Sequence, residues 1–580
     1  MTTDNGSTEL GLERLTENLQ RVEALTQRLL AAVSHKKPVR PALQGPGHDL
    51  FTKAATAYVT EMMSNPSRMI EQQIAYWGQS LQHFVDSQSA PADRRFSDPM
   101  WNEHPYFNFI RQQYLLNTKA METAVAQMDN LDTRERQKLD FFSRQIMDMF
   151  SPSNFLGTNP QALARAVETD GESLVRGLEN LVRDIEANNG DLMVTLADQG
   201  AFDVGSNIAT TPGKVVFRNH LFELIQYSPT TQTVQEVPLV IFPPWINKFY
   251  IMDLRPENSL VKWIVEQGFT LFVVSWINPD AAMRDTGVDT YIEDGFIAAI
   301  EQVKKICDVP QVNTMGYCIG GTTLSLTLAL LAQRGDTSVK SATLLTTLTD
   351  FSDQGEMSVF LDDDFVDGIA AEVEENGVLN KFFMSRTFSF LRSNDLIYGP
   401  AIRHYMMGET PPAFDLLYWN GDGTNLPGRM AIEYLRGLCQ RNQFADGGFE
   451  VCGARLQLSD IGVPVCAVAC ETDHIAAWAQ SYRGVQQMTG ADRHFILAES
   501  GHVAGIINPP QRNKYGFYTQ KSLVESPEDW QSSAAYTAGS WWPAWKEWLM
   551  LHSGKSIEPR KPKSPKGLKL GNAPGRYVLK

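Results

Sequence analysis

Residues Gly316-Tyr317-Cys318-Ile319-Gly320-Gly321 are the stretch that decides the fold of this chain. A short apolar stretch, 312–316, precedes them, and an apolar stretch that reads as a buried helix, 322–331, follows them. A strand, a tight turn and a helix in this order form a nucleophile elbow, in which small residues flank the nucleophile because the turn is narrow. The pattern therefore predicts that Cys318 is held out at the carboxyl edge of a parallel sheet.

Cys318 stands where such elbows commonly carry serine. Part of a thiol is already ionised near neutral pH, so cysteine is the better nucleophile toward thioesters. The other five cysteines show no metal-ligand spacing and are expected to be free, small buried residues in a reducing compartment. They are Cys307, Cys439, Cys452, Cys466 and Cys470.

The length and composition of the chain limit which architectures and partners are possible. The chain has 580 residues, of which 43% are hydrophobic and 20% charged, so it has room for more than one domain and a large core. The net charge of -16 argues against a nucleic-acid partner. The polar, acidic start is not a secretory signal, and no apolar run approaches the length of a membrane span.

The first 200 residues carry helical patterns and predict a helical N-terminal domain over 1–200. Leucines recur at helical spacing over 12–29, a Pro/Gly-rich linker covers 35–47, and helical runs follow over 49–88, 104–128, 132–149 and 160–188. Aromatic residues in these runs either pack inside the domain or form a surface for self-association or for an apolar product. They include Trp77, Tyr106, Phe107 and Phe109.

From residue 201 to 580 the pattern predicts a catalytic α/β domain. A hairpin is expected over 214–227, and apolar strands over 237–242, 270–276, 312–317, 342–348, 463–469 and 495–497, the last two closing the series. The stretch 351–442 breaks this rhythm and predicts a cap or lid, with Phe382, Phe383, Phe388 and Phe390 among its aromatic residues. The basic tail, 555–580, is expected to be loosely packed or to contact an acidic partner.

A cysteine nucleophile needs a base, and the two last expected strands are each followed by a polar group. Asp473 and His474 follow the first of them, and His502 follows the second. The chain order of nucleophile, acid and histidine is that of the α/β-hydrolase fold, whose sites lie at the carboxyl ends of strands. We therefore predict Cys318, Asp473 and His502 as the catalytic residues.

An oxyanion hole needs two backbone N–H groups near the nucleophile. Ile319, directly after Cys318, supplies one. The loop Pro243-Pro244-Trp245-Ile246-Asn247-Lys248 is expected to supply the other. Proline has no N–H, so the donor lies beyond Pro244, and Ile246 is our choice; the alternative is a stiff loop that shapes only the pocket wall.

These motifs together resemble those of the polyhydroxyalkanoate synthases, class I-like enzymes of the poly(3-hydroxybutyrate) polymerase family. The resemblance runs from about residue 95 to the C-terminus. It rests on the elbow and on the segments 151–155, 243–254, 418–420, 473–475, 500–505 and 573–578.

The resemblance implies an acyltransferase that polymerises (R)-3-hydroxyacyl-coenzyme A, of the short-chain type, with release of coenzyme A. It implies Cys318 as nucleophile and His502 as base, while Asp473 either orients His502 or activates the 3-hydroxyl. Trp245, Asn247, Tyr418, Trp419 and His474 are expected in the pocket or cap. It also implies no cofactor beyond the substrate's coenzyme A, a homodimer, and a cytoplasmic location at the surface of polyester granules, with possible granule-associated protein partners.

Without the resemblance, the residues indicate only a class of reaction and not a substrate. They indicate a cysteine-dependent acyltransferase or hydrolase, so a thioesterase or a polyester depolymerase is the alternative enzyme. A non-catalytic granule-associated subunit is the alternative from another class, and the intact set of Cys318, Asp473 and His502 argues against it.

Overall fold

The computed structural model describes residues 5–34, 93–126, 128, 133–563 and 569–580, which form two compact units. The first unit contains the chain up to Asp198 together with Arg386–Pro412, and the second contains Gln199–Ser385 and Ala413–Lys580. Residues 386–412, which lie inside the predicted cap segment, thus belong to the first unit. The linker over 35–47, the helix expected over 49–88 and Trp77 lie outside the described residues.

The first unit is helical. Its described helices are α1 (Asn5–Ser34), η2 (Arg94–Phe96), α4 (Met100–Glu103), α5 (Pro105–Ala126), α6 (Thr133–Met149), η3 (Pro152–Asn154), η4 (Leu156–Thr158), α7 (Pro160–Glu168), α8 (Glu172–Ala187), η10 (Asn394–Tyr398), α15 (Gly399–Ala401) and η11 (Ile402–Met406). Leu25 of α1 packs on Val175 and Val182 of α8, so an apolar stripe joins these two helices. The single run expected over 160–188 is wrong, because Asp170 and Gly171 adopt left-handed φ angles of 50° and 81° and separate α7 from α8.

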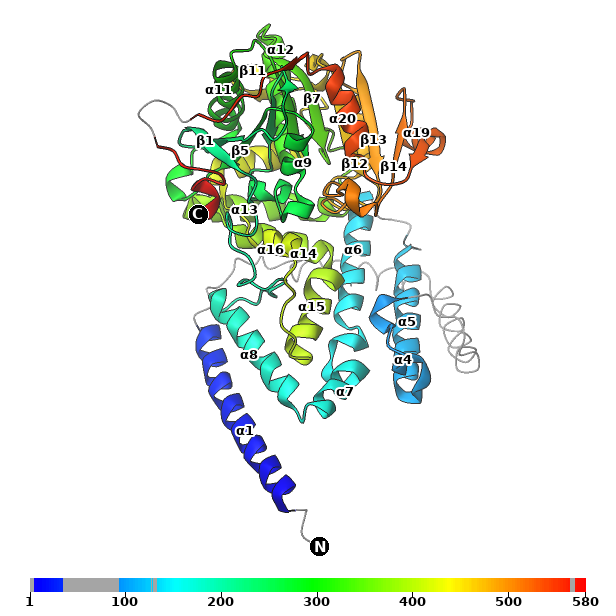
Figure 1. Cartoon of the computed structure of the whole chain (residues 1–580). Coiled ribbons are helices and arrows are strands. Elements are labelled where there is room, and N and C mark those ends of the chain that lie inside the picture. The colour runs from blue at the N-terminus through cyan, green and yellow to red at the C-terminus, as the bar shows by residue number, and fades with distance from the viewer. Residues whose placement is uncertain (1–4, 35–92, 127, 129–132, 564–568) are drawn as a thin grey trace. The chain divides into compact units, whose positions relative to one another are not determined.

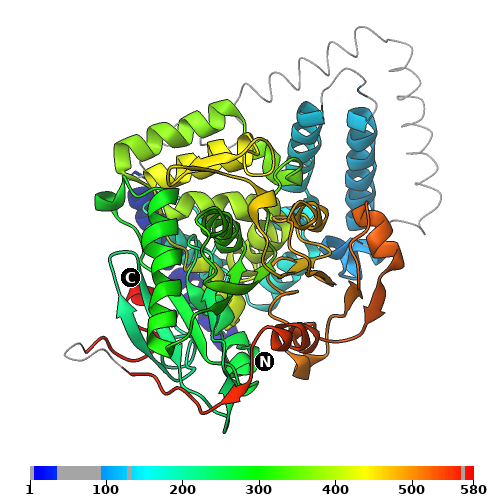
Figure 2. The ribbon, with the colours of Figure 1, turned by 90° about the horizontal axis from the view of Figure 1, so that it is seen from above.

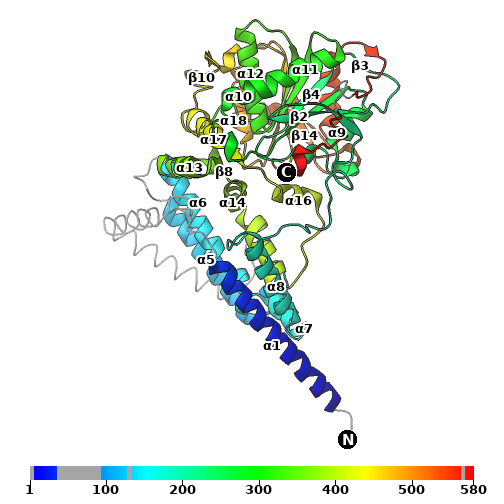
Figure 3. The same cartoon turned by 90° about the vertical axis from the view of Figure 1, so that its left-hand side faces the viewer.

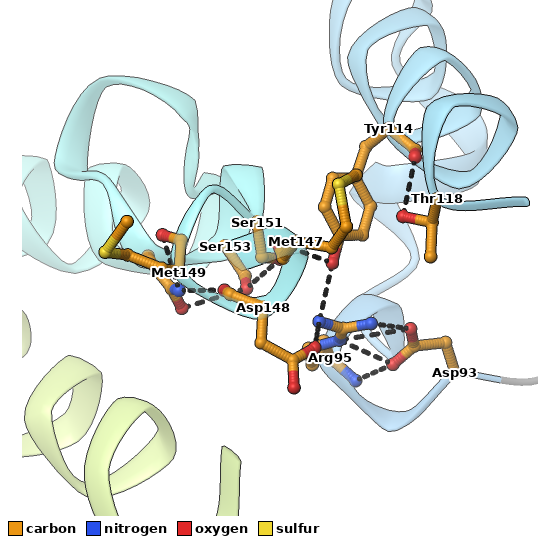
Figure 4. A network of polar contacts seen from close by, with 10 residues as sticks. Asp93, Arg95, Tyr114, Thr118, Met147, Asp148, Met149, Ser151 and Ser153 are labelled. Carbon is orange, nitrogen blue, oxygen red and sulfur yellow. Dashed lines mark hydrogen bonds and ion pairs between the residues drawn. The ribbon is translucent and has the colours of Figure 1, made fainter. Parts of the chain in front are cut away.

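A polar network ties η2, α5 and α6 together (Figure 4). The Arg95 guanidinium donates to the Tyr114 hydroxyl at 2.8 Å and to an Asp148 carboxylate oxygen at 2.7 Å. Tyr114 in turn donates to the Met147 carbonyl at 3.1 Å, and the Asn154 amide donates to the Asp148 carbonyl at 2.7 Å. Asn154, in one of the segments that carry the resemblance, therefore has a structural contact in this unit.

Some aromatic residues of α5 pack inside the unit and others lie on its surface, the two environments expected from the sequence. Phe107 is buried in a cluster with Trp101 and Tyr114. Tyr106 and Phe109, in contrast, are 49% and 52% exposed. Part of the aromatic content of this helix therefore packs inside the unit and part lies on its surface.

The second unit is built on a ten-stranded sheet with the order β1-β2-β5-β4-β6-β7-β12-β13-β14-β15. Neighbours from β5 to β13 are parallel, and β1, β2, β14 and β15 add antiparallel edges. The strands are β1 (Gly213–Arg218), β2 (Phe222–Tyr227), β4 (Leu239–Phe242), β5 (Leu271–Trp276), β6 (Val312–Tyr317), β7 (Val339–Leu345), β12 (Val465–Cys470), β13 (Arg493–Ala498), β14 (Phe517–Gln520) and β15 (Ala535–Thr537). The expected hairpin and parallel strands are confirmed, but β14 and β15 extend the series that was expected to end near residue 497.

Helices cover both faces of this sheet (Figures 1 and 3). The helices of the second unit are α9 (Leu260–Glu266), α10 (Val288–Thr290), η8 (Tyr291–Ile297), α11 (Ala298–Cys307), α12 (Ile319–Gln333), α13 (Asp363–Asn376), α16 (Asp415–Gly421), α17 (Gly428–Glu433), η12 (Tyr434–Gln440), α18 (Trp478–Gln486), α19 (Pro527–Ser533) and α20 (Trp542–Leu551), and the boundary between the units falls inside α14 (Lys381–Leu391). Trp263 of α9 packs on Trp542 and Trp545 of α20, on the face opposite α11 and α12. Short strand pairs join β3 (Val234–Gln235) to β16 (Ser556–Ile557), β8 (Val378–Leu379) to β9 (Leu426–Pro427), and β10 (Phe449–Val451) to β11 (Ala454–Leu456).

The described end of the tail is anchored, not loosely packed as expected (Figure 2). The Glu223 carboxylate of β2 is fully buried, pairs with Arg218, and accepts hydrogen bonds from the backbone N–H groups of Arg576 and Tyr577 at 2.7 and 3.0 Å. Val578 is buried in the core of the unit. The backbone of the tail is thus held at this end of the sheet by hydrogen bonds to Glu223, which lies more than 350 positions earlier in the chain.

Across the described ranges, the structure contains no helix with the length and apolar character needed to cross a membrane.

Candidate active site

Cys318 occupies a strained turn between β6 and α12. Its φ of 53° and ψ of -125° lie outside the regions that side chains other than glycine favour. A side chain at Gly316 would come within 2.5 Å of the Gly321 Cα, and one at Gly320 within 2.5 Å of the Phe242 carbonyl oxygen. The close packing of this turn explains the glycines around Cys318 and leaves its thiol partly exposed beyond the strand.

Asp473 and His502 come from the loops after β12 and β13 and form a hydrogen-bonded pair. The His502 Nδ1 lies 2.7 Å from the Asp473 Oδ2. The other carboxylate oxygen, Oδ1, accepts from the backbone N–H groups of Ile475 and Ala476 at 2.8 and 2.9 Å. The Asp473 side chain has no exposed surface, so both of its oxygens are used within the protein.

The Cys318 side chain lies close enough to the imidazole of His502 to act on its charge state. Burial alone would lower the His502 pKa, but the charges of Asp473 and Cys318 and the hydrogen bond to Asp473 raise that pKa well above its ordinary value. Because Nδ1 faces Asp473, the Nε2 side of the ring is the one left for the thiol. The structure thus brings the three predicted residues together in the order nucleophile, histidine, acid.

Tyr317 contacts His502 through both its ring and its hydroxyl group. Its ring stacks on the imidazole, with 5.8 Å between the centroids and 23° between the planes, and its hydroxyl donates to the His502 carbonyl at 3.1 Å. Tyr317 lies directly before the nucleophile, so one strand end supplies both the thiol and a wall for its base. The sequence analysis did not assign this role, although Tyr317 is in the quoted elbow.

The loop expected to supply the second oxyanion donor lies beside the elbow. The Trp245 indole N–H donates to the Thr323 hydroxyl of α12 at 3.1 Å, and a side chain at Gly320 would meet the Pro243 carbonyl at 2.7 Å. Ile319, the first residue of α12, directly follows Cys318. The loop holding Ile246 and the start of α12 are therefore packed against each other.

A second segment of the same unit clamps this loop. The Lys248 ammonium lies 2.8 Å from the Asp422 carboxylate, which also accepts from the Tyr250 hydroxyl at 2.8 Å. The Trp419 indole donates to the Lys248 carbonyl at 2.7 Å, and the Thr424 N–H donates to the Ile246 carbonyl at 3.3 Å. We call these contacts the 248–422 clamp. The sequence analysis did not identify Asp422 as part of the site.

The remaining residues expected in the pocket or cap are scattered around this region. Asn247 forms a β-bridge with Gly423, the Tyr418 ring packs on Phe202 at 5.1 Å between centroids, and His474 is half-buried next to Asp473. Phe382 and Phe383 belong to the second unit, whereas Phe388 and Phe390 belong to the first.

A further aromatic residue, Tyr434, lies close to the nucleophile. Its ring packs edge-on against Trp245, with 5.5 Å between the centroids. Burial and the nearby thiols of Cys439 and Cys318 raise the Tyr434 pKa well above its ordinary value. The segment after α16 thus contributes a wall of the site that the sequence analysis did not name.

The cysteines outside the elbow are free, as expected. Four of them are buried and Cys452 is half-buried. Among the residues with described placement, no cluster of three His, Cys, Asp or Glu side chains has the arrangement of a metal site.

The elbow at Cys318 and the Asp473–His502 pair at the strand ends of this sheet have the arrangement of the α/β-hydrolase fold. A sequence profile of the alpha/beta hydrolase fold matches residues 238–509, and one described as "Poly-beta-hydroxybutyrate polymerase (PhaC) N-terminus" matches residues 92–264. The chain is 39% identical to the "Poly(3-hydroxyalkanoate) polymerase" of Methylorubrum extorquens, over 94% of each chain. It is 41% identical to the "Poly(3-hydroxyalkanoate) polymerase subunit PhaC" of Cupriavidus necator, over 87% of this chain and 86% of that one. This chain therefore belongs to the poly(3-hydroxyalkanoate) polymerases, enzymes of the acyltransferase type.

Proposed function

We propose that this protein polymerises (R)-3-hydroxyacyl-coenzyme A, with 3-hydroxybutyryl-coenzyme A as the preferred substrate, into a polyester and releases coenzyme A. The observation that carries the proposal is the hydrogen-bonded pair of His502 and Asp473 beside Cys318 in a chain of this family. A thiol paired with an imidazole is the nucleophile suited to a thioester.

In the first step, His502 takes the Cys318 proton and the sulfur attacks the thioester carbonyl. The carbon–sulfur bond to coenzyme A breaks, the departing thiolate takes the proton from His502, and the acyl group stays on Cys318. Backbone N–H groups of Ile319 and Ile246 are proposed to bind the developing oxyanion. Coenzyme A acts here as part of the substrate.

In the second step, His502 takes the proton of a 3-hydroxyl group, and the resulting oxygen attacks the acyl group on Cys318. A new ester bond forms, the carbon–sulfur bond breaks, and the Cys318 thiolate is restored beside the protonated His502. Repetition of the two steps lengthens the polyester. Water must be kept from the acyl-enzyme, and Trp245 and Tyr434 are apolar walls suited to that task.

Asp473 is proposed to act through His502, not directly on the substrate hydroxyl. Its Oδ1 already accepts two backbone hydrogen bonds, its Oδ2 faces His502, and its side chain has no exposed surface. A substrate hydroxyl therefore has no free carboxylate oxygen to approach. His502, in contrast, has its Nε2 side turned toward the nucleophile.

The assembly and location of the protein are also proposals. The family resemblance favours a homodimer at the surface of cytoplasmic polyester granules. The exposed Tyr106 and Phe109 of α5 supply apolar surface for such contacts.

The product of purified protein with (R)-3-hydroxybutyryl-coenzyme A tests the proposed reaction. We expect free thiol release together with chloroform-soluble polymer. Thiol release with only free 3-hydroxybutyrate would assign a thioesterase instead, and loss of mass from added polyester without any need for coenzyme A would assign a depolymerase.

A further inference from the structure

A cavity of about 780 Å³ lies in the second unit, between the α17–η12 segment and the β10–β11 hairpin. Cys318, Asp473 and His502 are not among the described residues that line it. Its volume is in the range of sites that hold small organic ligands. It is therefore a candidate site apart from the catalytic residues.

Four arginines line this cavity, Arg429, Arg436, Arg441 and Arg455, with three acidic residues, Asp289, Glu433 and Glu450. Arg429 pairs with both Asp289 and Glu433, at 2.8 Å each, so two of the acids share one arginine. Arg436 pairs with Asp367, which is not among the residues that line the cavity. The lining residues thus carry four positive and three negative charges, and the two arginines that form no ion pair with a described residue are the ones open to a ligand.

Arg441 and Arg455 are the two guanidinium groups without a partner. Both are exposed, and neither side chain forms a hydrogen bond or an ion pair with any residue whose placement is described. Arg455 lies opposite Glu450 in the hairpin register, yet no ion pair joins these two residues in the described structure. Unpaired arginines at a concave site are suited to bind the oxygens of a phosphate group in a bidentate manner.

The apolar part of the cavity lining, which we call its floor, is closely packed around Gly437 and Phe449. A side chain at Gly437 would come within 2.4 Å of the Phe449 ring, so the ring covers this glycine closely. The hairpin that carries Phe449 and Arg455 turns through Cys452 and Gly453, whose φ angles of 53° and 72° are those of a tight two-residue turn. Apolar groups from Ile432, Phe449 and Val451 thus stand beside the arginines.

We propose that this cavity binds a phosphate-bearing ligand of nucleotide size, with Arg441 and Arg455 on the phosphate groups and the apolar floor under the base. Two sources share this chemistry. One is the adenosine 3′-phosphate 5′-diphosphate end of the coenzyme A substrate, an assignment that rests on the proposed function. The other is a free nucleotide that acts on the enzyme from outside the reaction.

Binding is measured by titration calorimetry with three probes: adenosine 3′,5′-bisphosphate, AMP and inorganic pyrophosphate. The full chain carries Cys318→Ala, so the result does not depend on turnover. We expect the bisphosphate to bind, with an affinity that falls as salt is added. The double variant Arg441→Ala, Arg455→Ala is expected to weaken this binding at least tenfold. Arg512→Ala, which removes an exposed arginine of the same unit outside this cavity, is the matched control and is expected to leave binding within twofold.

Thermal melting of each variant establishes that it is folded. No binding of any probe at millimolar concentration would overturn the proposal, and so would equal weakening by the control and the double variant. In enzyme with Cys318 intact, a raised KM for acyl-coenzyme A with unchanged kcat in the double variant assigns the coenzyme as the ligand. Unchanged KM with lost bisphosphate binding assigns a separate nucleotide. Because binding is measured without catalysis, failure of the proposed polymerase reaction leaves this test intact.

Discussion

Replacing Asp473 by asparagine keeps the size of the side chain but can place a hydrogen-bond donor, in place of an acceptor, opposite His502. The amide has one oxygen and one NH₂ group, and the structure decides which group faces the histidine. Ile475 and Ala476 both donate backbone N–H groups to Oδ1. Turning the NH₂ toward these two donors would leave both unsatisfied, at a cost of about 1–3 kcal/mol each.

The amide oxygen therefore stays on Ile475 and Ala476, and the NH₂ group faces His502 Nδ1. The imidazole must then accept at Nδ1 and carry its proton on Nε2, the tautomer that is unable to take the Cys318 proton. A matching change in a serine protease triad lowers kcat by about 10⁴-fold, or roughly 5.4 kcal/mol. We expect a loss of similar size, about 10³–10⁴-fold, in acylation of Cys318.

The assay is single-turnover loading of labelled 3-hydroxybutyryl-coenzyme A onto Cys318, followed by chain elongation. Asp473 raises the His502 pKa, so its loss lowers that pKa and makes His502 a poorer partner for the Cys318 proton. Alkylation of Cys318 by iodoacetamide at pH 7 is therefore expected to slow.

The matched control is Asp492→Asn, which makes the same change in the pair that Asp492 forms with His552 at 3.0 Å, away from the elbow. It is expected to leave loading within twofold. Normal loading and alkylation with stalled elongation in Asp473→Asn would refute the orienting role and favour direct action on the 3-hydroxyl.

Further predictions concern the nucleophile, the clamp, the tail and the N-terminus. Cys318→Ala is expected to lower coenzyme A release at least about 10³-fold with an unchanged melting temperature; turnover retained in that variant would contradict the mechanism. Asp422→Asn weakens the hold on Lys248, whose side chain is only 9% exposed, and is expected to slow acylation about 10–100-fold while Cys318 alkylation stays normal. Equal loss of both readouts would indicate a disturbed elbow instead. Glu223→Leu leaves Arg218 and two backbone N–H groups without their acceptor, so the free energy of unfolding measured in urea is expected to fall by about 3–5 kcal/mol. The control Glu257→Leu changes an exposed residue, and its free energy of unfolding is expected to change by about 0.5 kcal/mol or less. Deletion of residues 1–90 is expected to weaken self-association in light scattering and slow polymer initiation while Cys318 still loads; a fully active truncation with normal assembly would show that this region does neither job.

Several details of this protein depend on which distant segments meet, and local patterns do not reveal that. Tyr250 and Asp422, 172 positions apart, meet in the 248–422 clamp. Residues 386–412 join the N-terminal unit although they follow part of the cap in the chain. β14 and β15 were not predicted because they are short strands without an apolar alternation at the end of the sheet, where pairing with a neighbour decides the strand.

The elbow, in contrast, could be predicted from six residues, because the steric demand for glycine around Cys318 is local. The positions of Asp473 and His502 followed from their place after two apolar strands, since parallel strands bring their carboxyl ends to one edge. The sequence by itself thus determined the fold class and the place of Cys318, Asp473 and His502 at the strand ends, while their catalytic roles stay predictions. Only the tertiary structure decided the pairing of Asp473 with His502, the anchoring of the tail on Glu223 and the gathering of four arginines around one cavity, because each of these joins segments that lie apart in the chain.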